Sequence, residues 1–106
     1  MAAKVLGQAA PVATTETALY TVPGGKSVVG SSLVVCNRSS ITTTFRVSVS
    51  VGGGATANKD YLAYDTPITG NDVGVLTIGY TLGAADVVRC YANDAVLSFT
   101  AFGDES

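Results

Sequence analysis

Apolar and polar residues alternate along most of this chain with a period of two, which predicts β-strands. The segment "TFRVSVSVGGG" shows the pattern most clearly, with one face carrying Phe45, Val47, Val49 and Val51 and the other carrying Arg46, Ser48 and Ser50. Such alternation is typical of a half-buried strand, and the glycines that follow predict its end. No segment shows a convincing helical period.

Several other segments read as strands. The stretch "SSLVVCNRSS" is apolar on both faces from Leu33 to Cys36 and stops at Asn37, which predicts a strand covered on both sides. In "VGVLTIGYTL", period two places Leu76, Ile78, Tyr80 and Leu82 on one face, opposite Val73, Val75, Thr77 and Thr81.

Two further strands are predicted near the C-terminus, in "DVVRCYAND" and "AVLSFTAFG". Their apolar residues in register are Val88, Cys90 and Ala92, followed by Leu97, Phe99 and Ala101. We expect both sets to face the core.

Glycine, proline, asparagine and aspartate separate these runs at short intervals. In "LYTVPGGKSVV", Val22 to Gly25 has the type II turn pattern, with Pro23 at the second position and Gly24 at the third. Other corners are predicted at residues 52–54, 69–72, 83–86 and 93–94. The residues on either side of each corner are therefore strand ends.

Strands of this number and spacing predict an all-β protein. About seven or eight short strands, with turns every 8 to 12 residues or so, are typical of a single antiparallel β-sandwich. The topology is either jelly-roll-like or immunoglobulin-like, and the spacing does not decide between them. Residues 18–106 form the predicted sandwich. Residues 1–17 have no strong period, and we expect an extended N-terminal arm ordered by lying on a neighbouring subunit.

Composition narrows the functional classes. The chain has 106 residues, of which 47% are apolar and only 13% charged, about half the usual share of charge in soluble domains. A net charge of −2 and singly scattered basic residues argue against nucleic-acid binding. The apolar runs are too short to span a membrane, and the first residues lack the continuous stretch of a signal peptide. We expect the chain to stay in the cytosol until it assembles.

Catalytic, metal and cofactor sites are not predicted. The chain has no histidine, the commonest general base and an ordinary zinc ligand. Its aspartates lie mostly at predicted turns, where they bond to backbone, and "GGKS" at residues 24–27 lacks the leading glycine of a phosphate-binding loop. Cys36 and Cys90 have no CxxC spacing, and we expect two buried free thiols, although a disulfide between facing strands is conceivable.

Tyrosines supply most of the aromatic content. Tyr61 and Tyr64 follow the glycine-rich segment at residues 52–54. Tyrosine combines a large contact area with a hydroxyl group, so these side chains suit either a protein contact or stacking on a sugar. Partly buried strand tyrosines are the plainer interpretation.

The order of segments along the chain resembles a group of small virion structural proteins of tailed bacteriophages, including phages of cyanobacteria. The segments are "KVLGQAAP", "TALYTVPGGKSVVGSSLVVCNRS", "TTFRVSVSVGG", "NKDYLAYDTPI", "VLTIGYTL", "DVVRCYA" and "LSFTAFGDE", which together run from Lys4 to Glu105. The stretch "LYTVP", followed by an apolar strand and asparagine, is also similar to modules of phage tail and fibre proteins. The resemblance implies a virion β-module without catalytic residues.

Three functions follow as hypotheses. The first is an oligomeric structural subunit of the tail, baseplate or fibre-attachment region, assembled with other virion proteins. The second is a decoration protein on the capsid, and the third is a module that binds host-surface glycans. The residues that we expect at subunit contacts are Lys4, Val5, Leu6, Val12, Gly53, Lys59, Tyr61, Tyr64 and Phe102. Phe102 lies opposite the core-facing side of its strand, so it is the best single apolar anchor.

Overall fold

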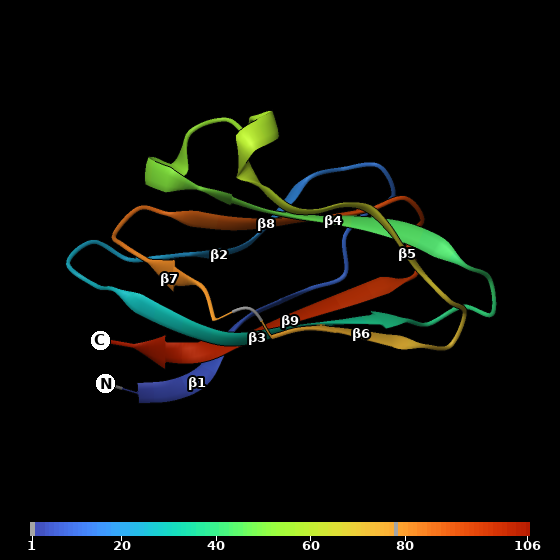
Figure 1. Cartoon of the computed structure of the whole chain (residues 1–106), viewed down its shortest axis with the longest axis horizontal. Coiled ribbons are helices and arrows are strands. Elements are labelled where there is room, and N and C mark those ends of the chain that lie inside the picture. Colours follow the sequence, from blue (N-terminus) through green and yellow to red (C-terminus); the bar gives the residue numbers. More distant parts are fainter. Residues whose placement is uncertain (1, 78) are drawn as a thin grey trace.

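A computed structural model describes residues 2–77 and 79–106 of the chain. In these residues, nine strands form two antiparallel sheets packed face to face (Figure 1). The strands are β1 (Ala2–Ala9), β2 (Thr17–Thr21), β3 (Val28–Asn37), β4 (Thr43–Ser50), β5 (Tyr61–Ile68), β6 (Val73–Leu76), β7 (Thr81–Leu82), β8 (Val87–Ala92) and β9 (Leu97–Glu105), with short 3-10 turns η1 (Val51–Gly53) and η2 (Asn58–Asp60). The predicted β-sandwich is therefore confirmed.

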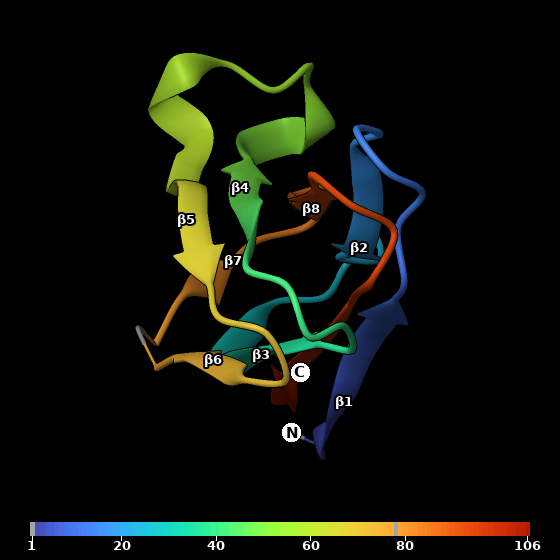
Figure 2. The same ribbon diagram turned by 90° about the vertical axis from the view of Figure 1, so that its right-hand side faces the viewer.

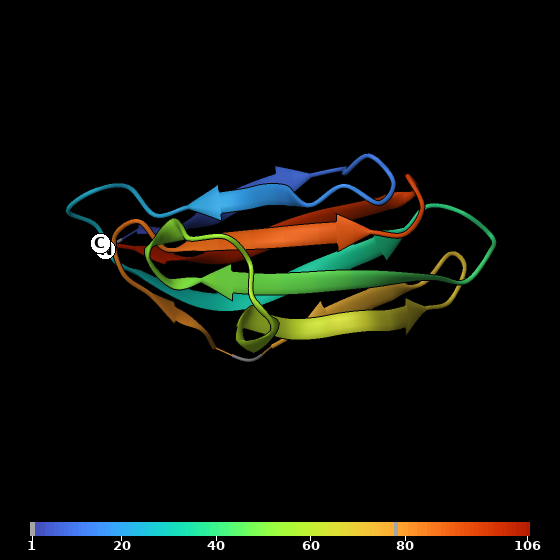
Figure 3. The same ribbon diagram turned by 90° about the horizontal axis from the view of Figure 1, so that it is seen from above.

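The strand order identifies the topology. Sheet A has the order β1-β9-β3-β6, with β7 also paired to β3, and sheet B has the order β2-β8-β4-β5. Figure 3 shows the four strands of sheet B side by side. Strands β6 and β7 pair with different parts of β3, so they act as one interrupted strand. Counted that way, the first strand pairs with the last, the second with the next-to-last, and so on inward, which is the order of a jelly roll.

The core lies between the sheets and contains most of the residues that period two assigns to it. The predicted core residues of β8 and β9 are all buried: Val88, Cys90, Ala92, Leu97, Phe99 and Ala101. The rings of Phe45 in sheet B and Phe99 in sheet A meet edge to face, with centroids 6.2 Å apart. These two rings join the sheets near the middle of the sandwich.

The predicted faces of residues 73–82 are confirmed where the structure describes them. Leu82 is buried, and Leu76 and Tyr80 pack against the core. Val73, Val75, Thr77 and Thr81 are exposed. Ile78, predicted to share the face of Leu76 and Tyr80, lies outside the described residues.

Strand β4 departs from simple alternation near its end. Val51, predicted to face the core, is 80% exposed, because the pairing of β4 with β5 shifts at two irregularities and the chain then enters η1, where Gly52 has a φ of 74°. Ser50, predicted on the open face, is buried. Its hydroxyl contacts Asp60 and Arg89, which hold the following loop over it.

Strand β3 is covered on one side only. Leu33 and Val35 are buried in the core, whereas Val34 is half-buried and Cys36 is exposed on the outer side of sheet A. The prediction of a strand covered on both sides is therefore wrong. A run of apolar residues indicates burial on both faces only when a second layer covers the sheet, and this sandwich has two layers in all.

The first residues belong to the sandwich and do not form a separate arm. Strand β1 pairs with β9 along the edge of sheet A, from Ala2 opposite Glu105 to Ala9 opposite Phe99. A side chain at Gly7 would lie 2.1 Å from the carbonyl oxygen of Leu19, so glycine allows β1 to pass close to β2. We expected a neighbouring subunit to order the first residues, but residues 2–9 are ordered by pairing with β9 of the same chain.

The turns agree with the sequence except for one shift. The corners at 69–72 and 83–86 close with the N–H of Asp72 bonding to Thr69 and that of Asp86 to Gly83. In the "VPGGK" corner, the N–H of Lys26 bonds to the carbonyl of Pro23, and Gly25, not Gly24, has the positive φ. The turn is thus one residue later than predicted.

The two cysteines lie in different sheets and are both free. Cys90 is buried in the core, as expected, but Cys36 is exposed. Burial raises the pKa of the Cys90 thiol to about 12, which keeps it protonated and unreactive. The expectation of two buried thiols is therefore right for Cys90 and wrong for Cys36.

This difference predicts selective labelling. With a thiol-specific disulfide reagent at about pH 8, we expect Cys36 to react readily in the folded protein and Cys90 only after denaturation. The Cys36→Ser variant should show almost no native labelling, measured by absorbance or intact mass. Fast reaction of that variant without denaturant would contradict the burial of Cys90.

Candidate functional site

The outer side of sheet A carries a surface rich in valine, with Asp104 opposite Val29 at one end. We call this surface the outer face; it consists of Val5, Val29, Val34, Val73, Val75 and Phe102. The register brings members of the set together, because Val34 lies opposite Val75 and Val5 lies opposite Phe102. Strands β3 and β6 contribute no charged residue. On the facing strands, Thr100 lies beside Val34 and Ser32 lies beside Phe102, so the face consists of two apolar groups. Exposed apolar groups of this kind on a small domain are candidate interaction sites.

Two residues expected at contacts, Val5 and Phe102, lie beside each other in a shallow hollow at one end of this face. The hollow has a volume of about 370 Å³ and is lined by Ala3, Lys4, Val5, Ser31, Phe102, Gly103 and Asp104. Leu6, the neighbour of Val5, differs from its expectation because its side chain is buried in the core. Period two explains this difference, since adjacent strand residues face opposite sides.

Lys4 takes part in a polar cluster that joins the two sheets near the chain ends. Its Nζ lies 2.9 Å from Glu105 Oε1, and the Tyr20 hydroxyl donates a short hydrogen bond to the other carboxylate oxygen. Burial, and then the contact with Glu105, raises the pKa of Tyr20 to about 12. The hydrogen bonds from Tyr20 and Lys4 lower the pKa of Glu105. Lys4 therefore ties β1 to β9 within sheet A, and the Tyr20 hydroxyl joins this pair to β2 of sheet B.

The loop at residues 51–60 is held by the chain's own contacts. Arg89 donates to the Ser50 hydroxyl and to the carbonyl of Gly54, both at 2.7 Å, and to the carbonyl of Gly53 at 3.2 Å. The Ala57 N–H donates to Asp60 at 2.9 Å, and this bond is the main cause of the lowered pKa of Asp60. Gly53 and Lys59, two expected contact residues, are thus presented on a fixed loop.

The outer side of sheet B has a different chemistry. The guanidinium of Arg46 lies between two tyrosine rings, 4.2 Å from the centroid of Tyr64 and 4.4 Å from that of Tyr91. Its Nε bonds to Asp65 at 2.7 Å, which raises the pKa of Arg46. Asp65 has a φ of 48°, an uncommon value for a residue other than glycine. Arg46 thus holds the rings of Tyr64 and Tyr91 in place on the outer side of sheet B.

The two predicted tyrosines of β5 come together at the rim of this cluster. The rings of Tyr61 and Tyr64 meet edge to face at 4.8 Å between centroids. With Asn58 they line an open hollow of about 250 Å³. Sequence reasoning found the tyrosines but missed Arg46 and Tyr91, because only the pairing of β4 with its two neighbours brings these side chains to Tyr64. It also missed Asn58, which the short η2 turn places beside them.

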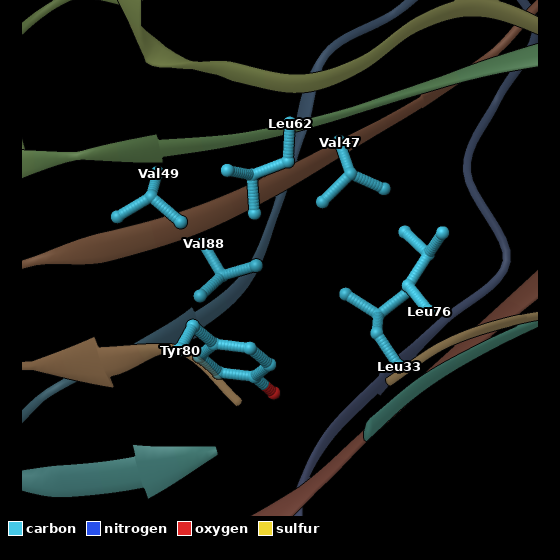
Figure 4. A pocket seen from close by; sticks show the side chains of 7 residues that line it. All are labelled: Leu33, Val47, Val49, Leu62, Leu76, Tyr80 and Val88. Carbon is cyan, nitrogen blue, oxygen red and sulfur yellow. The ribbon is translucent and has the colours of Figure 1, made fainter. Parts of the chain in front are cut away.

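Figure 2 shows the side of the sandwich where β5 and β6 lie. An apolar crevice lies between the sheets on this side (Figure 4). It is lined by Leu33, Val47, Val49, Leu62, Leu76, Tyr80 and Val88. Their side chains approach so closely that no water molecule fits. Leu62, at 47% exposure, lies on the open side. The crevice is therefore a seam between the sheets and has no room for a ligand.

Val12, the remaining expected contact residue, lies apart from these surfaces in the connection between β1 and β2 and is 70% exposed. Among the described residues, no three of His, Cys, Asp and Glu gather as a metal site would require. In the same part of the chain, no helix is long and apolar enough to cross a membrane.

Comparisons of this chain with protein-family models, curated proteins and solved structures found no match.

Proposed function

We propose that this chain is a non-enzymatic structural subunit of a bacteriophage virion, in the tail, baseplate or fibre-attachment region. The observation that carries the proposal is the outer face of sheet A, where Phe102 and several valines are accessible and where β3 and β6 carry no charged residue. Such a surface suits a subunit that is covered by neighbours in a larger assembly. The resemblance of the chain's successive segments to small phage virion proteins is the reason for proposing a phage particle as this assembly.

Copy number tests this proposal and its head-located alternative. Quantitative mass spectrometry of purified phage particles would give the number of these chains relative to the major capsid protein. We expect about six to a few dozen copies, as a ring, collar, baseplate or fibre position requires. Copies on the order of hundreds would instead place the chain as a decoration protein of the capsid. Absence from the particle would overturn both structural functions.

Phe102 gives a residue-level prediction of the same function. Its side chain is half-buried on the outer face, so we expect Phe102→Ala to change the free energy of unfolding by less than about 1 kcal/mol. We expect the same variant to lower incorporation into particles, measured by complementation and particle mass spectrometry. A lowered melting temperature with unchanged incorporation would show that Phe102 only closes the end of the sandwich.

Glycan binding is a second candidate, favoured by the hollow lined by Asn58, Tyr61 and Tyr64. Two angled rings beside an amide side chain can stack on a sugar and bond to its hydroxyl groups. Binding on a glycan array that disappears in Tyr64→Ala, but not in Tyr20→Phe, would support this function. An array with no signal at high protein concentration would remove it.

A further inference from the structure

Strand β6 is the least protected edge of the sandwich. Natural edge strands usually carry charges, prolines or bulges that prevent pairing with another chain. The opposing edge strand of sheet B, β5, has Pro67 and the positive φ of Asp65, and β1 has Lys4 and a register shift. Residues 73–83 contain no charged residue and no proline. In the described part of the chain, no strand of sheet A lies beyond β6 and β7.

The backbone of β6 directs unsatisfied groups outward. Opposed residues in an antiparallel pair alternate between those that exchange hydrogen bonds and those that do not. The Asn37 N–H bonds to the Asp72 carbonyl at 3.0 Å, which makes Asn37 and Asp72 a hydrogen-bonded pair. Val73 and Val75 lie one and three residues after Asp72, so both direct their N–H and C=O groups away from β3. Asp72 Oδ1 accepts the Val73 N–H at 2.8 Å. The Val75 N–H and the carbonyls of Val73 and Val75 are the groups that another strand would meet.

We propose that this edge pairs with β6 of a second copy of the chain, in antiparallel orientation, with the two-fold axis at Gly74. In this register, the Val75 N–H of each copy donates to the Val73 carbonyl of the other. Val73 of one copy also lies beside Val75 of the other on the outer face, which extends that face across both subunits. This inference names the first neighbour of the subunit and rests on the proposed structural function.

Self-pairing fits the chemistry of this edge better than pairing with a different strand. A two-fold interface places the same surface on both partners. Val73, Gly74 and Val75 carry no charge and can meet their own copies without repulsion, while the flanking Asp72 carboxylate is held by the Val73 N–H of its own strand. An edge meant for a different charged partner would carry complementary charge along its paired residues. The pairing also brings the open sides of the two crevices together, where Leu62 is exposed.

The paired area is small, because β6 has four residues and stable interfaces bury more than about 1,000 Å². We therefore expect a dimer that depends on protein concentration in solution. Repeated copies in a particle would strengthen it, since neighbouring sites act at high effective concentration.

Sedimentation of the full chain over a range of concentrations tests the proposal. We expect the mass to rise toward that of a dimer in the wild type. Val75→Pro removes only an outward N–H, a position where an edge strand tolerates proline, and Val75→Lys adds a charge at the interface. Both variants should remain monomers at the highest concentration while the melting temperature stays near that of the wild type. Val12→Lys, which adds the same charge at an exposed valine far from β6, should still dimerise.

Cross-linking tests the register separately. In the proposed dimer, residue 74 of one copy faces residue 74 of the other at a non-hydrogen-bonded position. Cα atoms in such pairs lie about 4.5 Å apart, which is within the range of a disulfide. A cysteine at Gly74 has ordinary contacts only, since its Cβ would lie 3.8 Å from Ile68. In a Cys36→Ser background, we expect Gly74→Cys to form a covalent dimer under mild oxidation and Gly24→Cys, in an open turn, to form none.

The outcomes separate this inference from the proposed function. A wild type that is monomeric at every concentration, or dimers that persist in both Val75 variants, would overturn β6 pairing. Monomers that nevertheless occur in particles would overturn β6 self-pairing and leave the structural function standing. A β6 dimer absent from particles would instead overturn the proposed function alone.

Discussion

Replacing Phe99 by alanine is expected to lower the free energy of unfolding by about 3–5 kcal/mol, the usual range for a buried phenylalanine. The side chain is 1% exposed and packs against Phe45 across the two sheets. Its strand lies between β1 and β3, opposite Ala9 and Val35, so neighbouring strands cannot close the cavity without losing their own pairing. Urea unfolding followed by circular dichroism would measure the change.

The matched control is the same substitution three residues later. Phe102 lies on the same strand but on the outer face, so Phe102→Ala should retain nearly the stability of the wild type. For a domain of this size, the loss at Phe99 corresponds to a fall in melting temperature of more than about 12 °C. Equal losses for the two variants would contradict the assignment of one phenylalanine to the core and the other to the surface.

Much of the fold was predictable because period two is a local signal. The core faces of β8 and β9 follow directly from alternation, and the corners at 69–72 and 83–86 follow from residues that favour turns. Strand pairing is not local. The jelly-roll order depends on which distant strands meet, and the pairing of β1 with β9 joins the two ends of the chain. This is why residues 1–17 were expected as an arm.

The wrong predictions have a common physical origin. Cys36 and Val51 are apolar residues in apolar segments, and both are exposed. For Cys36, no third layer covers sheet A, and for Val51, the strand ends one residue earlier than its pattern. A sequence reports that a face is apolar, but not whether another layer or another subunit covers it. The surfaces that we assign to assembly are the ones where this ambiguity is greatest.

The candidate surfaces were predictable in part. Alternation separated Phe102 from the core and grouped Val73 with Val75. The Arg46 cluster was not predictable, because it combines side chains from β4, β5 and β8. The outward direction of the Val75 N–H was also hidden from the sequence, since hydrogen-bonded and non-bonded positions alternate only once a register is fixed.

The side chain of Asn37, the last residue of β3, connects two turns of the sandwich. Its side chain is buried, at 2% exposure. Nδ2 donates to the carbonyls of Ile41 at 2.9 Å and of Ile68 at 3.2 Å, while Oδ1 accepts from Ser39. One amide thus ties the turn after β3 to the turn between β5 and β6. Sequence reasoning identified the boundary and missed the bridge.

We expect Asn37→Ala to lower the free energy of unfolding by about 2–4 kcal/mol, because it removes the amide that donates to the buried Ile68 carbonyl and that links the two turns. Asn37→Asp should be at least as unstable near neutral pH, since its carboxylate would face the carbonyls of Ile41 and Ile68. Those carbonyls and burial should raise the folded-state pKa of this carboxyl above its unfolded value of about 3.9. The contribution of this carboxyl to stability is therefore greatest below about pH 3.9 and is lost as the pH rises through its folded-state pKa.

The comparison with Asn37→Ala separates hydrogen bonding from packing. Only a protonated aspartate regains a donor, so the difference in stability between Asn37→Asp and Asn37→Ala should favour the aspartate variant in acid and disappear or reverse at neutral pH. Urea unfolding at several pH values would measure this difference and cancel the acid response of the other carboxylates, which both variants share. Asn93→Ala, at an exposed asparagine whose amide lies 3.4 Å from Asp94, should stay within about 0.5 kcal/mol of the wild type. A pH-independent difference between the two Asn37 variants would mean that the amide fills space and that its hydrogen bonds do not hold the two turns together.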